Sequence, residues 1–195
     1  MRRKIMSLLA YCGVAALAVY MFTGYFSNPK EKKDDQVETL TVKSSDFVSG
    51  GRMPDKHAYQ KGNVSPQLTW DNVPDEAKSI AVVCDDPDAF SVAKKVWVHW
   101  VMFNLPADTR ELAPDVAKDK ELANGARQGV NDFEGAIGFD GPWPPEKHGD
   151  HHYHFKVYAL DVMLDLPAGA TKQQLEKAMQ GHILAQGELV GVYSR

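Results

Sequence analysis

The sequence predicts a mainly β protein, an antiparallel β-sandwich of two sheets with a few peripheral helices, preceded by one amino-terminal transmembrane helix. Short apolar or alternating runs recur between residues 37 and 193, and turns rich in proline and glycine separate them. One segment near the end shows helical periodicity instead. The chain has 195 residues, of which 44% are hydrophobic and 25% charged, as expected for one globular domain with a short extra element. A two-sheet sandwich is the simplest way to bury such strands.

Residues 1–28 are predicted to form a membrane anchor. Arg2, Arg3 and Lys4 precede residues 5–26, which contain no charged side chain. As a helix this run would be roughly 33 Å long, enough to cross the ~30 Å hydrocarbon layer of a bilayer. A cleaved signal peptide is the alternative, although no small-x-small cleavage site follows the run. Residues 29–36 then form a polar linker and residues 37–195 the folded domain.

The anchor also predicts where the domain lies. Three cations lie on each side of the apolar run, so the positive-inside rule does not predict which end of the helix faces the cytoplasm. We expect the usual outcome for a short basic amino terminus, a single-pass protein of the cell inner membrane whose domain faces the periplasm or the cell exterior. Cleavage would give a secreted or periplasmic protein instead. The formal net charge of −4, with no basic run beyond the amino terminus, argues against a nucleic-acid partner.

Within the domain, the pattern predicts five strands and one helix. Residues 37–42 alternate with period two, as a half-buried strand does. Residues 79–84 and 96–103 are apolar runs, the second interrupted by His99, and predict strands buried on both faces. Residues 153–160 and 189–193 are further strands. Residues 172–180 predict the helix, with a capping box formed by Thr171 and Gln174 and an end at Gly181.

Three polar segments carry the candidate chemistry. Asp86 and Asp88 directly follow the apolar run 79–84, where such residues are also ordinary loop caps. A contact between Asp86 and His99 on the neighbouring strand is feasible, and a carboxylate would orient the ring and favour its charged form. The glycine- and proline-rich segment 138–145 brings bare backbone N–H groups to a ligand, or else is a rigid connection.

The third segment, residues 148–154, contains four histidines and suggests a metal site. In a strand, however, His151 and Tyr153 face one way while His152 and His154 face the other, so we assign no metal and no cofactor. The sequence lacks nucleophile-elbow, phosphate-loop and His-Glu-x-x-His motifs, and we assign no catalytic residue. Imidazoles, a tyrosine hydroxyl, backbone amides and carboxylates suit holding a small oxyanion better than breaking a bond.

A series of short motifs runs through residues 37–195: GNVSPQLTW at 62–70, DPDA at 86–89, HWV at 99–101, NDF at 131–133, GPWPP at 141–145, HHY at 151–153, GHILA at 181–185 and GEL at 187–189. The combination resembles the phosphatidylethanolamine-binding protein family, especially its bacterial Raf-kinase-inhibitor-like branch. The resemblance implies a β-sandwich with a pocket for phosphate-like anions and phospholipid headgroups. Matched position by position, the implied pocket residues are Asp86, Asp88, His99, Gly141, Pro142, His151 and Tyr153. Phe90 stands where the family usually has proline, which affects the pocket entrance.

The leading interpretation is a non-catalytic binding protein for a small anion, either phosphate or a phospholipid headgroup, with modulation of a partner protein as a further expectation. Two alternatives stay open. Asp86 and His99 could form the acid–base pair of a hydrolase. The domain could also be an inhibitor or scaffold that acts through surface contacts.

Overall fold

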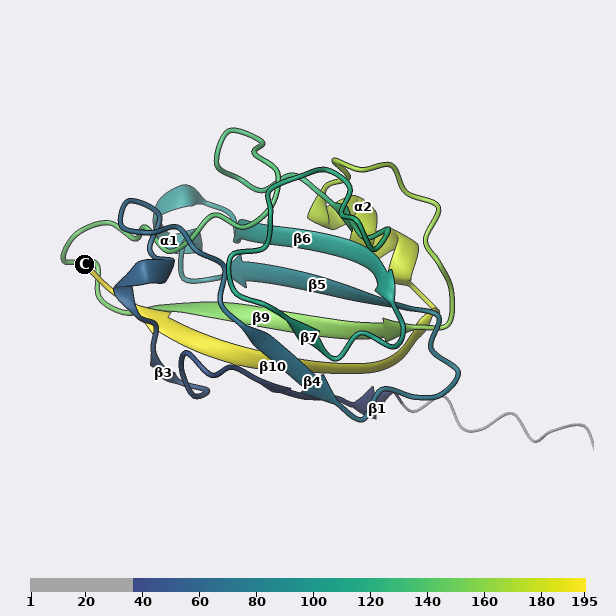
Figure 1. Ribbon diagram of the computed structural model, residues 1–195. Helices are drawn as coiled ribbons and strands as arrows, with labels where there is room; N and C mark the ends of the chain where they lie inside the picture. Colours follow the sequence, from purple (N-terminus) through teal and green to yellow (C-terminus); the bar gives the residue numbers. More distant parts are fainter. Residues whose placement is uncertain (1–36) are drawn as a thin grey trace, which may run out of the picture. The chain divides into compact units, whose positions relative to one another are not determined.

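The computed structural model describes residues 37–195, which lie in the compact unit Asp35–Arg195. The predicted transmembrane helix and polar linker fall outside the described residues, so the anchor, its cleavage and the location of the domain stay predictions. Within residues 37–195, no helix combines the length and apolar character that crossing a bilayer requires. These residues form two β-sheets with a small number of helices, which confirms the mainly β class (Figure 1).

The larger sheet has seven strands in the order β1-β10-β9-β5-β6-β8, and β3 pairs with β10 outside this path (Figure 1). Its strands span Glu38–Thr39 (β1), Gly51–Arg52 (β3), Ser79–Asp86 (β5), Trp97–Pro106 (β6), Arg127–Gln128 (β8), His151–Leu160 (β9) and Ile183–Tyr193 (β10). The smaller sheet, β2-β4-β7, contains Thr41–Lys43, Leu68–Asp71 and Glu111–Leu112. Most pairs are antiparallel, but β1 and β3 both pair with β10 in parallel, so the all-antiparallel prediction is wrong there.

Strand β5 lies at the centre of the larger sheet, between β6 and β9. All 8 of its residues are buried, as the continuous apolar run predicts. Ile80, Val82 and Cys84 pack in the core between the two sheets. Ala81 and Val83 point to the opposite face, where a second core forms. Because both faces are covered, the last two residues of β5, Asp85 and Asp86, are buried as well.

The second core lies under helix α2, which spans Lys172–Met179 and buries Leu175 and Met179. Both hydrogen bonds of the predicted capping box are formed between Thr171 and Gln174. Helix α1, Phe90–Ala93, and the 3-10 turn Asp55–His57 are not foreseen by the sequence pattern. Each is too short to show a helical period.

The first predicted strand is divided between the two sheets. Strand β1 pairs with β10 in the larger sheet, and β2 pairs with β4 in the smaller one. Leu40 lies between them, is buried, and donates its backbone N–H to the carbonyl oxygen of Gln186 at 2.9 Å. This crossing requires glycine at position 187, because a Cβ there would lie 2.2 Å from the Leu40 carbonyl oxygen. The alternating pattern therefore predicts extended chain correctly but not its change of sheet.

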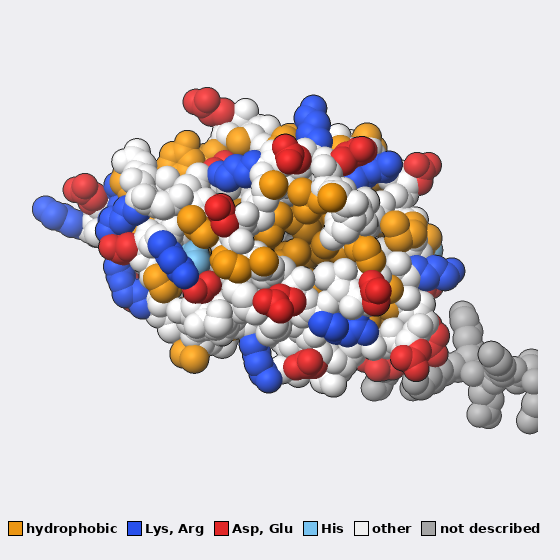
Figure 2. Space-filling model, in the orientation of Figure 1, with side chains coloured by type: hydrophobic (Ala, Val, Ile, Leu, Met, Phe, Trp, Pro, Cys, Tyr) orange, Lys and Arg blue, Asp and Glu red, His pale blue; other side chains and the backbone are white. Residues whose placement is uncertain are grey.

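The smaller sheet has only three strands, so loops also cover part of the core between the two sheets. Val73, Ala77, Val116 and Leu122 pack partly buried against this core. On the face viewed in Figure 1, charged side chains lie mostly toward the margin and hydrophobic side chains gather in a hollow near the middle (Figure 2).

Candidate functional site

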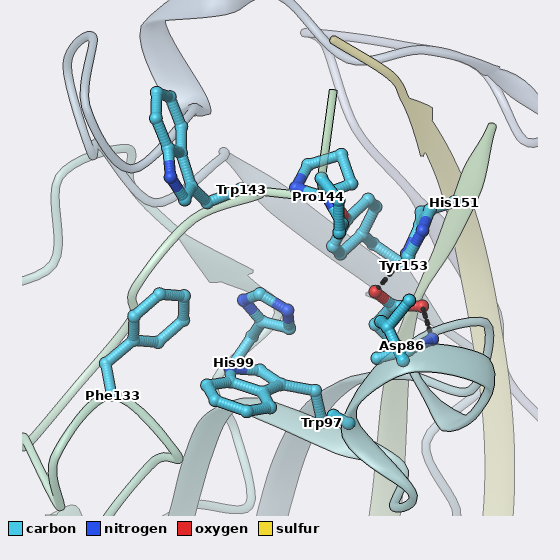
Figure 3. A pocket seen from close by; sticks show the side chains of 12 residues that line it. Asp86, Trp97, His99, Phe133, Trp143, Pro144, His151 and Tyr153 are labelled. Carbon is cyan, nitrogen blue, oxygen red and sulfur yellow. Dashed lines mark hydrogen bonds and ion pairs between the residues drawn. The ribbon is translucent and has the colours of Figure 1, made fainter. Parts of the chain in front are cut away.

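A cavity of about 250 Å³ lies where β5 ends and where β6 and β9 begin (Figure 3). Helix α1 contributes the apolar side chains of one wall. Four polar residues line the cavity: Asp86 from β5, His99 from β6, and His151 and Tyr153 from β9. Aromatic and proline side chains form the remaining wall: Trp97, Phe133, Trp143, Pro144 and Pro145. The structure thus brings four of the seven predicted pocket residues to one cavity.

A β-bulge places His99 in the cavity wall. The pairing of β5 with β6 shifts by one residue between Cys84 and Asp85, and His99 is the extra residue on β6. Its ring nitrogen Nδ1 lies 2.6 Å from the backbone carbonyl oxygen of Asp140. In return, the backbone N–H of Asp140 donates to the carbonyl oxygen of His99 at 3.0 Å. These two hydrogen bonds join His99 to Asp140 and fix the imidazole against the residue that precedes the turn at Gly141 and Pro142.

This contact also determines which ring nitrogen carries the hydrogen. A carbonyl oxygen only accepts, so Nδ1 of His99 must donate, and Nε2 of the neutral ring keeps its lone pair. Burial lowers the pKa of His99 from its usual 6.5, although the Asp140 carbonyl and the carboxylates of Asp86, Asp140 and Asp132 oppose this effect. Near neutral pH, His99 therefore presents an acceptor rather than a donor to the cavity that its ring lines.

Asp86 contacts His151 and not His99, which corrects the predicted pair. Oδ2 of Asp86 lies 2.7 Å from Nδ1 of His151, and Oδ1 accepts the backbone N–H of Ala89 at 3.2 Å (Figure 3). The two side chains are 4% and 1% exposed. The reason is the strand order. β5 lies between β6 and β9, so Asp86 can reach a histidine on either neighbouring strand. His99 on β6 is bound to Asp140, and Asp86 therefore contacts His151 on β9. The acid–base pair that the hydrolase alternative required is not formed.

His151 continues this contact into a chain of hydrogen bonds. Nε2 of His151 lies 2.8 Å from Nδ1 of His148, and Nε2 of His148 lies 3.3 Å from Oγ of Ser91. The Ser91 hydroxyl in turn donates to the carbonyl oxygen of Asp88 at 2.9 Å. Because both ring nitrogens of His151 are engaged, its imidazole orients Asp86 and fixes β9 but offers no ring nitrogen to a ligand.

Trp97 and Tyr153 both line the cavity, and each side chain carries a hydrogen-bond donor. The indole Nε1–H of Trp97 is buried and has no hydrogen-bond partner among residues 37–195. Burial raises the pKa of Tyr153 well above its usual value, so its hydroxyl keeps the hydrogen. The Tyr153 ring meets the His99 ring edge-to-face, with centroids 5.0 Å apart. A donor pair and an acceptor therefore share one small space.

Gly141 and Pro142 lie beside the cavity rather than in its wall. Gly141 donates its N–H to Oδ1 of Asn63 at 2.8 Å, so the amide expected to hold a ligand is already bound. A Cβ at this position would lie 1.7 Å from the carbonyl oxygen of His57, which only glycine avoids. The Pro142 carbonyl accepts the backbone N–H of Tyr59 at 3.0 Å. These contacts brace the turn that carries the next three residues into the wall.

Asp88 also lies outside the cavity wall, with its side chain 42% exposed. Its Oδ2 accepts the backbone N–H of His152 at 2.8 Å and lies 2.7 Å from Nδ1 of the same residue. On β9, His151 and Tyr153 are buried, whereas His152 is exposed and His154 half-buried. The predicted division of the histidines between two faces of the strand is confirmed.

A family model described as phosphatidylethanolamine-binding protein matches residues 43–194, which include every residue that lines the cavity. The chain belongs to the phosphatidylethanolamine-binding protein family. This family member is 46% identical to a UPF0098 protein of Methanothermobacter thermautotrophicus over 156 residues, 80% of this chain and 99% of the relative. It is 41% identical to a UPF0098 protein of Aquifex aeolicus over 157 residues, covering 80% and 89%.

Two solved structures share its fold. Escherichia coli YbcL, described as a new member of the mammalian PEBP family, superposes with a TM-score of 0.73 at 33% identity, covering 80% of this chain and 98% of that one. The homologue CT736 of Chlamydia trachomatis gives a TM-score of 0.71 at 37% identity, covering 81% and 99%. The expected family and its two-sheet fold are therefore both confirmed.

In this family member, sequence reasoning missed Trp97 and the residues at 143–145 as parts of the wall. An indole N–H inside a buried strand needs a partner, and that requirement was the available signal for Trp97. The position of Trp143 and Pro144 depends on Arg195, whose guanidinium carbon lies 3.4 Å from the Trp143 ring centroid and whose Nε donates to the Pro144 carbonyl at 2.7 Å. No local pattern signals a contact over that distance along the chain.

Proposed function

We propose that this protein is a non-catalytic binding protein whose cavity holds a small oxyanion, either inorganic phosphate or the phosphate of a phospholipid headgroup. The observation that supports it is that Trp97, Tyr153 and His99 line one cavity, and that the buried indole N–H of Trp97 has no hydrogen-bond partner among residues 37–195. Hydrogen bonds to an ionised acceptor are the strong ones, so the N–H of Trp97 and the O–H of Tyr153 suit an anion. The family match, to proteins named for binding phosphatidylethanolamine, supports the same ligand class.

The size of the cavity supports a headgroup rather than a whole lipid. About 250 Å³ is smaller than the ~300–1,000 Å³ typical of sites for drug-sized ligands, so acyl chains would remain outside. Binding is favoured over hydrolysis because Asp86 and both ring nitrogens of His151 are already engaged with protein partners. A surface-acting inhibitor or scaffold would not need the cavity at all.

Residues beside the cavity favour a phospholipid as the source of the anion. Phe90 and Val92 of α1 are 59% and 46% exposed, and Val92 also lines the cavity. Lys94 and Lys95 follow directly and are exposed too. Exposed apolar side chains next to lysines are typical of segments that enter the headgroup region of a membrane.

The test titrates the full-length protein by calorimetry with inorganic phosphate and with phosphoethanolamine, and measures its co-sedimentation with vesicles that contain or lack phosphatidylethanolamine. Soluble phosphoethanolamine and vesicles together distinguish a free anion from a lipid headgroup. Tyr153→Phe and Trp97→Phe each remove one donor while keeping an aromatic ring. A hydrogen bond to a charged group contributes about 1.5–3 kcal/mol, so each change should weaken binding roughly 10- to 150-fold.

The matched control is His154→Gln, which alters the opposite face of β9 and should leave affinity unchanged. No heat with either anion at any pH between about 5 and 8, a range that spans imidazole titration, would end the proposal. Undiminished binding by both phenylalanine variants would also end it, because the anion would then lie elsewhere.

A further inference from the structure

The orientation of His99 creates an electrostatic problem for a bound anion. Its Nδ1 donates to the Asp140 carbonyl at 2.6 Å and cannot turn toward a ligand without giving up that bond. The residue is 2% exposed, so water does not compensate for a broken bond. The neutral ring therefore directs a lone pair, not an N–H, at whatever occupies the cavity. An oxyanion without an O–H group, such as a phosphodiester, brings only further lone pairs.

The other polar residues of the wall do not solve the problem. Asp86 is bound to His151 and to the backbone of Ala89. His151 has no free ring nitrogen, because His148 takes the second one. Tyr153 and Trp97 carry one donor hydrogen each, but neither donates it to Nε2 of His99. That contact becomes favourable only if a hydrogen is added to it.

We propose that the cavity binds an oxyanion together with one proton, held between Nε2 of His99 and a ligand oxygen. This inference rests on the proposed function and specifies its ligand chemistry. A monoprotonated phosphate or phosphomonoester brings the proton itself. A phosphodiester headgroup has none to give, so its binding takes one proton from solvent onto His99.

The charges around His99 favour this proton uptake. Asp86 faces it from β5, Asp132 and Asp140 from the segment 131–141, and Tyr153 from β9. Two cations are bound to these carboxylates: Lys118 pairs with Asp140 at 2.6 Å, and Lys95 pairs with Asp132 at 2.7 Å. Helix α1 and the wall 143–145 place no charged side chain in the cavity. A bound anion adds a negative charge next to a ring that three carboxylates already surround, which raises its proton affinity further.

Proton linkage gives the expected magnitude. When a ligand binds only the protonated form of one group, its association constant falls tenfold for each pH unit above the pKa of that group. The probe is glycerophosphoethanolamine, a phosphodiester whose phosphate does not titrate near neutrality. Calorimetry of the full-length protein between about pH 6 and 8.5 should show this slope, and buffers of different ionisation enthalpy should show uptake of close to one proton per ligand.

His99→Gln removes the titrating group and should remove both the slope and the proton uptake. His152→Gln, at an exposed histidine of β9 outside the cavity, is the matched control and should keep both. The wild-type protein supplies a second measurement, independent of how well the variant folds. The ¹⁵N resonance of His99 Nε2 should move from an imine-like to a protonated position when the probe is added.

Three results would overturn the inference. Binding that is independent of pH would do so, and so would a slope retained in His99→Gln. An Nε2 resonance that stays imine-like with the probe bound would do so as well. The wild-type protein could also bind phosphate, phosphoethanolamine and the diester without taking up a proton. That result would leave the proposed function intact and refute only the inference that a proton is bound with the anion. Failure to bind any of the three ends both.

Discussion

Two Asp–His pairs have the same N···O distance of 2.7 Å, but one is buried and the other exposed. Breaking each pair should therefore lower the free energy of unfolding by a different amount. Asp86 and His151 have side chains 4% and 1% exposed, whereas Asp88 and His152 are 42% and 48% exposed. Asp86→Asn keeps the shape, but its oxygen must still accept from the backbone N–H of Ala89. Its NH₂ group then faces Nδ1 of His151, which has to give up its hydrogen. A buried charged hydrogen bond lost in this way should cost about 1.5–3 kcal/mol.

Asp88→Asn makes the same chemical change at the surface and should cost no more than about 1 kcal/mol. Urea unfolding of the wild type and both variants at one pH measures the two differences directly. Nitrogen-15 spectra of the imidazoles give a second readout, because Nδ1 of His151 should lose its hydrogen and become imine-like only in Asp86→Asn. Equal losses in the two variants would refute the reasoning that burial, rather than pair geometry, sets the contribution.

Three other predictions follow from named contacts. Gly141→Ala places a methyl group against the His57 carbonyl oxygen and should lower the free energy of unfolding by about 1–3 kcal/mol or more, whereas Gly135→Asn, in open space at positive φ, should cost well under 1 kcal/mol in the same urea titration. Phe90→Ser should reduce co-sedimentation with phosphatidylethanolamine vesicles several-fold and leave phosphoethanolamine affinity unchanged, whereas Val48→Ser, 76% exposed, should change neither. Burial lowers the pKa of His57 from its usual 6.5. As the pH is lowered through 6.5, the unfolded chain binds a proton that the native ring does not, so the free energy of unfolding decreases. In His57→Gln the urea midpoint should depend less on pH between about pH 7 and 5, and an unchanged pH dependence would contradict this.

The strands and the helix that burial dictates could be predicted from local patterns. Residues 79–84 and 96–103 are apolar on both faces, and each proves to be an inner strand, β5 and β6. The helix after Thr171 carries its own start signal. The chain near Leu40 could not be predicted, because an alternating pattern states only that one face is buried and not which sheet receives it. The close approach that permits the crossing depends on Gly187, far away in the sequence.

The same limit separates what could be predicted of the site from what could not. His99 stands out as a polar residue in an apolar strand, and Tyr153 shares one face of its strand with His151; both line the cavity. The partner of Asp86 depends instead on strand order, which no local pattern encodes. The role of Gly141 was misjudged for a related reason. Its amide is satisfied by Asn63, a contact between segments 78 residues apart.

Hydrogen-bond directions in the chain that starts at Asp86 explain why proton uptake falls to His99. The Ser91 hydroxyl donates its only hydrogen to the Asp88 carbonyl oxygen, so its oxygen must accept in the hydrogen bond with Nε2 of His148. A neutral His148 that donates there has to accept at its other nitrogen, and the donor is then Nε2 of His151. Nδ1 of His151 faces Asp86, so both ring nitrogens of His151 are engaged within this chain of hydrogen bonds. The ring of His151 therefore has no hydrogen to offer a ligand. Among the four polar residues that line the cavity, His99 alone can still gain a positive charge when an anion arrives, since Tyr153 has only a hydrogen to share and Asp86 only lone pairs.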